Sequence, residues 1–195
     1  MNKTKIMKFF QKLSKAFLTP LALIAAASLA MGIASFFKSE NIINCIPFLD
    51  NSFIQYFFTI ILEMGSIITG NFPAIYAVTL AFALAEEDKG YAAFSGFVGY
   101  LSFLTGMGML ISNFPQLASK FPGNGLTTVL GIDTVNTGLL GGIMVGILTS
   151  IIHKKAKKVR LPMAFAFFSG LRLVPIVSVF TFVILGNLFP FVWVY

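Results

Sequence analysis

Long apolar stretches constrain this chain more than any other feature of its sequence. About 20 helical residues cross a hydrocarbon core of roughly 30 Å, and only 11% of the residues here are charged, against roughly 25% in soluble domains. We therefore expect an all-α, polytopic transmembrane helical bundle with about five spans. The apolar stretches are Phe17–Phe37, Phe53–Ala85, Tyr91–Ile111, Val135–Ile152 and Leu173–Trp193.

The second stretch, Phe53–Ala85, is too long for one straight crossing and contains Gly70 and Pro73. It is either one interrupted span or two short spans joined by a turn. Cytoplasmic segments are enriched in Lys and Arg. One crossing places twelve of the 14 Lys and Arg inside, leaving only Lys38 and Lys120 outside, whereas two crossings place six inside and eight outside. We therefore expect one span broken near Gly70-Pro73, where proline disturbs the helix.

The same count predicts the membrane topology. Residues 1–16, with five lysines, form a cytoplasmic basic segment, and residues 17–195 form the transmembrane region. The connections Glu86–Gly90 and His153–Leu171 are expected in the cytoplasm, and Lys38–Ser52 and Ser112–Thr134 outside. Within the longer cytoplasmic connection, residues 163–170 are apolar but too few to span, which predicts an interfacial or re-entrant segment.

Two charged side chains are candidates for function. Glu63 lies about ten residues into its apolar stretch, at a depth where a carboxylate is costly and usually faces protein or water. It either belongs to a substrate path or reaches an interface because its helix is tilted and broken. Arg172 precedes the last stretch. It could bind a sugar or a phosphoryl group through two hydrogen bonds, or it could only extend to the membrane interface.

The basic run at residues 153–160 begins with His153. A lone histidine beside four lysines at a helix end is typical of a solvated terminus, so we expect no phosphotransfer residue there. The run itself is typical of a segment facing anionic lipid headgroups. Eight glycines in the third and fourth stretches predict close helix packing, either within one protomer or in a dimer.

The remaining composition narrows the class of protein. Cys45 is the single cysteine, which excludes a disulfide framework and a multi-cysteine metal site. We expect no catalytic residue, no metal and no cofactor. The net charge of +7 could indicate nucleic acid binding, but most positive charges flank apolar spans and orient them instead. No nucleotide-binding motif is present, which disfavours an ATP-driven pump.

Four segments together resemble a known family. Phe167–Ile176, FFSGLRLVPI, resembles the F-F-G-G-x-R-F-V-P-I signature of the IIC permease of the PEP-dependent sugar phosphotransferase system, glucose/maltose type. Phe10–Pro20, Ala83–Phe94 and Thr137–Gly142 resemble further motifs of that family, in the same order and at matching spacing. Asn136 stands where the family usually carries Asp, and Ser169 and Leu171 also depart from its pattern.

The resemblance implies sugar uptake coupled to phosphorylation. It implies that the chain is the N-terminal part of a IIC permease domain, and that the C-terminal sugar-binding half and the IIB domain are absent. Arg172, Glu63 and Asn136 are then substrate-path candidates. The implied partners are a glucose- or maltose-type sugar, a IIB domain or protein, a C-terminal IIC half, a second copy in a homodimer and the lipid bilayer. The expected location is the bacterial cytoplasmic membrane. The alternative is an inactive remnant or a non-transporting membrane scaffold or regulator.

Overall fold

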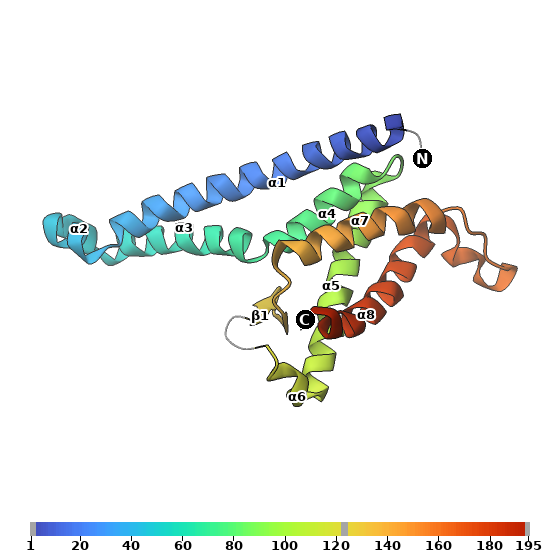
Figure 1. Ribbon diagram of the computed structural model, residues 1–195. Helices are drawn as coiled ribbons and strands as arrows, with labels where there is room; N and C mark the ends of the chain where they lie inside the picture. Colours follow the sequence, from blue (N-terminus) through green and yellow to red (C-terminus); the bar gives the residue numbers. More distant parts are fainter. Residues whose placement is uncertain (1–2, 122–124, 194–195) are drawn as a thin grey trace. The chain divides into compact units, whose positions relative to one another are not determined.

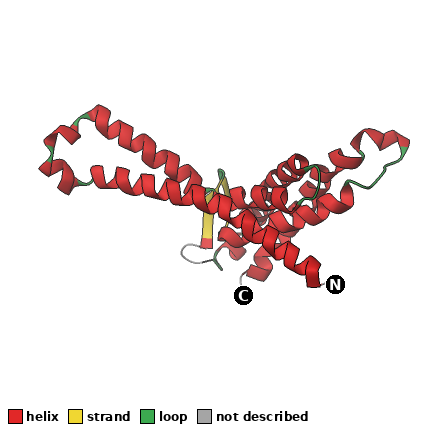
Figure 2. Cartoon of the chain, turned by 90° about the horizontal axis from the view of Figure 1, so that it is seen from above, coloured by secondary structure: helices red, strands yellow, loops and turns green. Residues whose placement is uncertain are grey.

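The computed structural model describes residues 3–121 and 125–193, and their side chains from Met7 onward. Most of this is helical (Figures 1 and 2). Five of the described helices are long and apolar enough to cross a membrane, which confirms the predicted fold class. They are contained in α1 (Lys3–Phe37), α3 (Ser52–Gly70), α5 (Lys89–Asn113), α7 (Gly138–Ala156) and η4 with α8 (Gly170–Arg172 and Leu173–Trp193).

The interruption predicted in the second apolar stretch is confirmed. Helix α3 ends at Gly70, and the shorter helix α4 (Phe72–Leu84) begins two residues later. Asn71 terminates α3: its backbone N–H and its side-chain amide donate to the carbonyl of Ile67 at 3.3 and 2.9 Å. Pro73 falls in the first turn of α4, where a missing N–H costs no intrahelical hydrogen bond. The result is a complete break between two helices.

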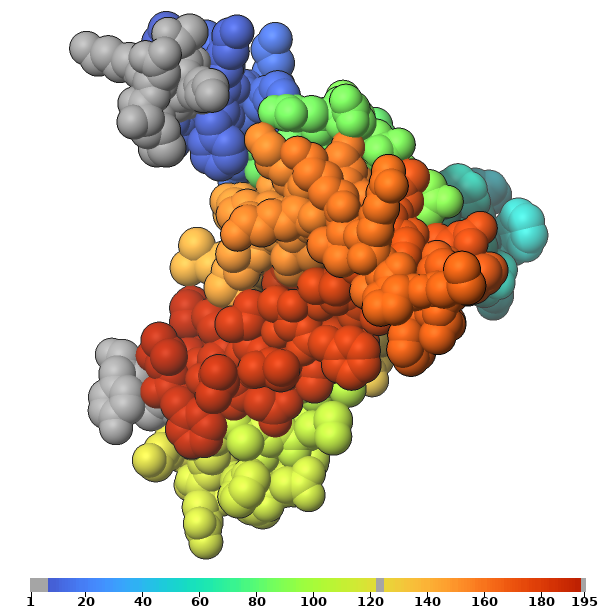
Figure 3. All heavy atoms as spheres, turned by 90° about the vertical axis from the view of Figure 1, so that its right-hand side faces the viewer, coloured from blue at the N-terminus to red at the C-terminus, as the bar shows by residue number. Residues whose placement is uncertain are grey.

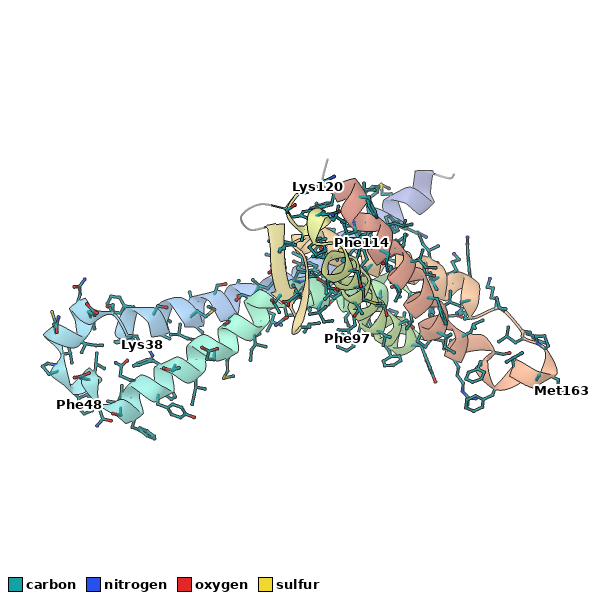
Figure 4. The ribbon with its side chains drawn as sticks, turned by 90° about the horizontal axis from the view of Figure 1, so that it is seen from below. Lys38, Phe48, Phe97, Phe114, Lys120 and Met163 are labelled. Carbon is teal, nitrogen blue, oxygen red and sulfur yellow. The ribbon has the colours of Figure 1, made fainter. Side chains whose placement is uncertain are left out.

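The chain forms two compact units, of which the smaller comprises Leu18–Phe72. Here the second part of α1 runs antiparallel to α3, with Phe37 stacked on Phe58 at 5.2 Å. A Cβ added at Gly65 would overlap the Met31 side chain, so glycine permits this close packing. The short helices α2 (Glu40–Cys45) and η1 (Pro47–Asp50) join the two long helices. Lys38 and Phe48, labelled in Figure 4, lie in this connecting region.

The larger unit comprises Met1–Phe17 and Pro73–Tyr195, and α5 is at its centre. Helix α5 packs against α8, α7 and strand β2 (Ile132–Val135). Tyr100, Phe103 and Met107 of α5 are buried, as is Phe182 of α8. The ring of Phe103 meets that of Phe189 edge to face at 5.2 Å. These side chains form the core of the unit.

Glycines bring the helices of the larger unit into backbone contact. A Cβ added at Gly106 of α5 would meet the carbonyl oxygen of Val183 in α8, and one at Gly186 of α8 would meet that of Phe103. Gly142 and Gly146 of α7 lie in the same way against the backbone of α4. These glycines therefore serve packing within one protomer, one of the two predicted roles. A dimer contact stays a prediction.

A β-hairpin precedes α7 and was not expected from the apolar stretches. Strand β1 (Leu126–Val129) pairs antiparallel with β2 through a two-residue turn. The turn residues Leu130 and Gly131 have φ of +52° and +75°, as a type I′ turn requires. The fourth predicted stretch therefore started too early: Val135 belongs to β2, and α7 begins at Gly138. The short helix α6 (Pro115–Ala118) lies between α5 and the hairpin.

Candidate functional site at the end of helix α7

Two oppositely charged segments meet at the C-terminal end of α7. The turn between α4 and α5 carries Glu86, Glu87 and Asp88. Lys157 Nζ lies 2.7 Å from Glu87 Oε2 and 3.4 Å from Asp88 Oδ2, and Lys154 Nζ lies 3.9 Å from Glu86 Oε1. The two connections predicted to share the cytoplasmic side therefore lie side by side in the larger unit.

The ion pair between Lys157 and Glu87 alters the protonation of both groups. The hydrogen bond from Lys157 and its positive charge lower the pKa of Glu87 below 4.5. Glu87 in turn raises the pKa of Lys157 above 10.5. Only 16% of the Lys157 side chain is exposed, against 76% for Glu87. The acidic turn thus holds Lys157 against the protein surface.

His153 is buried at this end of α7, so the predicted solvated terminus is wrong. Its residue surface is only 2% exposed. The Nε2 atom is buried without a hydrogen-bond partner in the described part of the chain. His153 follows Gly142 and Gly146 on the face of α7 that packs against α4. This helical spacing is a sequence signal for burial that our sequence analysis did not use.

A cleft of about 630 Å³ opens beside His153 within the larger unit. Lysines of two helices line it, Lys8 and Lys12 from α1 and Lys154, Lys155 and Lys157 from α7 and its end. The acidic turn contributes Glu86, and apolar side chains from α1, α4 and α7 complete the walls.

The segment after α7 folds into a closed loop. The backbone N–H of Gly170 donates to the carbonyl of Val159 at 3.3 Å, and that of Leu161 donates to Ser169 Oγ at 2.9 Å. Between these links lies η3 (Met163–Phe168), a single six-residue 3-10 helix. It is too short to span a membrane, as predicted. Its apolar side chains are exposed, with Met163 at 95% (Figures 3 and 4).

Arg172 lies in η4, at the junction between this loop and α8. Its Nη1 donates to the carbonyl oxygen of Phe167 at 3.1 Å. Its guanidinium carbon also lies 4.4 Å from the centre of the Phe167 ring, within the range of a cation–π contact. The side chain is exposed. Arg172 is therefore oriented by the aromatic loop and remains accessible at the same end of α7 as the cleft.

The other two substrate-path candidates belong to other elements than Arg172. Asn136 is exposed and accepts a hydrogen bond from the N–H of Gly138 at 3.2 Å, just before α7. The 19 residues of α7 separate it from Arg172 by about 28 Å along the helix axis. Glu63 is exposed on α3, in the smaller unit. The structure therefore does not bring Asn136 to Arg172, and all three assignments stay predictions.

Within the described residues, no group of three or more His, Cys, Asp and Glu side chains is arranged to hold a metal ion. Cys45 is exposed at the end of α2.

Comparison with known proteins identifies a family and two relatives. The family model described as "Phosphotransferase system, EIIC" matches residues 14–195. The "PTS system maltose-specific EIICB component" of Escherichia coli (strain K12) is 35% identical over 98% of this chain and 37% of its own length. The "PTS system glucose-specific EIICBA component" of Staphylococcus saprophyticus is 35% identical over 98% of this chain and 28% of its own length. The chain thus spans about a third of the length of these relatives.

Proposed function

Because the chain belongs to the phosphotransferase system EIIC family, we propose that it is a membrane permease component of a PEP-dependent sugar phosphotransferase system. The proposed activity is uptake of glucose- or maltose-type sugars with coupled phosphorylation. The observation that carries the proposal is the family match over residues 14–195. In the described part of the chain, five helices able to span a membrane fit this role. The proposed location is the bacterial cytoplasmic membrane.

The proposed partners follow from the resemblance and from the relatives' names. Since the two relatives are named EIICB and EIICBA components, we expect a IIB domain or protein to phosphorylate the sugar. We also expect this chain to work with a C-terminal IIC half. A homodimer belongs to the same proposal. Its contact would use surfaces other than Gly106 and Gly186, which already serve packing between α5 and α8.

The residues proposed for the sugar path are Arg172, Glu63 and Asn136. Arg172 has the clearest support, because its guanidinium is exposed and its orientation is set by Phe167. Five N–H donors in a planar arrangement suit sugar hydroxyls or a phosphoryl group. Glu63 supplies a carboxylate from α3, and Asn136 lies next to the N-terminus of α7.

Uptake in cells tests the proposed function. The chain is expressed in a strain that lacks its own glucose and maltose permeases, together with the part of the E. coli maltose-specific relative that lies beyond the matched region. We expect labelled sugar to accumulate in phosphorylated form only when both polypeptides are present. The control is each polypeptide alone. Normal membrane abundance without uptake of either sugar would contradict the proposal and favour a non-transporting scaffold.

A further inference from the structure

We propose that the cleft beside His153 binds the phosphate of an anionic phospholipid. This inference goes beyond sugar transport and does not depend on it. The cleft lies at one end of α7, a helix able to span the membrane, where its apolar residues give way to a basic run. That is the level at which lipid headgroups meet a spanning helix.

The charges around the cleft leave a positive surplus. Five lysines and one carboxylate line it. Lys157 is paired with Glu87 and Asp88, and Lys154 approaches Glu86. In the part of the chain that the structure describes, Lys8, Lys12 and Lys155 make no ion pair. A phosphate bound here would be their counterion, and positive side chains near an anionic headgroup favour such binding.

The buried imidazole adds a polar group to the wall of this cleft. His153 is 2% exposed, and its Nε2 atom has no hydrogen-bond partner among the described residues. An atom this buried is closed to a ligand in the cleft, so the imidazole contributes only to the wall. The lysines therefore carry the recognition of the phosphate.

Apolar side chains in the same cleft favour a lipid over a free phosphate. Phe9 and Ile151 line it and are 39% and 46% exposed, and Leu84, two residues before Glu86, also lines it. A free phosphate makes no use of such groups, whereas the glycerol and acyl carbons of a phospholipid bury apolar surface against them. The combination of lysines and apolar walls therefore indicates a lipid.

Binding to the full-length chain in lipid nanodiscs tests the proposal. The wild-type chain and two double variants are each placed in nanodiscs of phosphatidylcholine that contain a small fraction of phosphatidylglycerol. Native mass spectrometry then counts the lipids that stay bound to each protein. The cleft variant is Lys12→Gln with Lys155→Gln. The matched control is Lys158→Gln with Arg160→Gln, which removes the same charge from the same basic run outside the cleft. A basic residue near anionic lipid contributes about fivefold in affinity, so the cleft variant should bind phosphatidylglycerol about 25-fold more weakly.

Each outcome bears on the proposal. Retained phosphatidylglycerol in the wild-type chain, its loss in the cleft variant and a clearly smaller loss in the control support it. Equal losses in the two variants would show a diffuse basic surface and overturn it. Retention of phosphatidylcholine in equal amount would also overturn it, as would displacement of phosphatidylglycerol by an equal concentration of inorganic phosphate. Circular dichroism of each variant checks that the helices remain folded.

Discussion

The side chain of Arg172 illustrates how far single residues could be understood from the sequence. Its place before the last span was evident, and the family resemblance marked it. Its contact with Phe167, five residues earlier, was not evident from the sequence. That contact arises because η3 and Gly170, with φ of +70°, fold the aromatic loop back toward Arg172. His153 shows the opposite case: its spacing from Gly142 and Gly146 carried the signal for burial, but the neighbouring lysines suggested a solvated end.

Replacing Arg172 by lysine tests its role in transport. Lysine keeps the charge and reaches the interface equally well, but it lacks the planar group that bonds Phe167 and could bind a ligand at two points. In the two-polypeptide uptake assay we expect Arg172→Lys to lower sugar uptake about tenfold, the effect of losing one charge-assisted hydrogen bond. An immunoblot of the membrane fraction controls for abundance. Uptake at the wild-type rate would leave only an interfacial role for Arg172.

Glu87 allows a test by pH. Because Lys157 lowers the pKa of Glu87, ionised Glu87 stabilises the folded state above its unfolded pKa of about 4.5. That contribution is lost as the pH falls through the lower folded pKa. For Glu87→Gln we expect a Tm at pH 7 lower by at most 2–4 °C, since exposed ion pairs are weak. The difference from wild type should vanish in acid. Thermal unfolding in detergent measures the Tm of both proteins. If their Tm values still differ at a pH below both pKa values of Glu87, the charge of Glu87 is not the cause of the difference.

At the scale of elements, prediction succeeded where the signal was local. Long apolar stretches identified the spanning helices, and Gly70, Asn71 and Pro73 identified the break. The hairpin was missed although its sequence carried a signal: β-branched residues flank Leu130-Gly131 at the spacing of a two-residue turn. The partners of the glycines could not be predicted, because small residues permit close approach without specifying which helix approaches.

The contact between α5 and α8 predicts the effect of adding one methyl group. A Cβ at Gly106 would meet the backbone of Val183 and Asn187, which cannot rotate away as a side chain can. We expect Gly106→Ala to destabilise the fold by about 1–3 kcal/mol, measured as a lower Tm. Gly32→Ala in α1 is the matched control, because nothing lies within 4 Å of a Cβ added at Gly32. Alanine should be neutral or stabilising there. A similar Tm for both variants would refute the proposed tight contact.

At the scale of the whole molecule, the division into two compact units could not be predicted from the sequence. The boundaries fall inside α1, after Phe17, and next to the break at Asn71. The first lies within a continuous helix, where no change in local pattern marks it. Helix α1 has 35 residues, or about 52 Å, which exceeds the roughly 30 Å of a hydrocarbon core. We therefore expect its basic first part to extend beyond the core, as the predicted cytoplasmic segment requires.

Labelling of cysteines in intact cells tests the predicted topology. The native Cys45 is exposed and lies in a predicted external connection, so a membrane-impermeant maleimide should label it. In a Cys45→Ser background, Lys158→Cys should be labelled only after permeabilisation, because the basic run is predicted to be cytoplasmic. We choose Lys158 and not Lys157 for this substitution, because Lys157 forms an ion pair with Glu87. Labelling of Lys158→Cys in intact cells would contradict the predicted topology and indicate the inverted one.

The closed loop between Val159 and Gly170 has a consequence for how this chain can change over evolution. Its two ends are joined by backbone and side-chain hydrogen bonds, so the path from α7 to α8 is set at the base of the loop. Residues inserted near Met163, 95% exposed at its outer part, would lengthen the loop without moving either helix. Longer loops add little entropic cost. We therefore expect this position to accept an inserted epitope or a whole reporter domain.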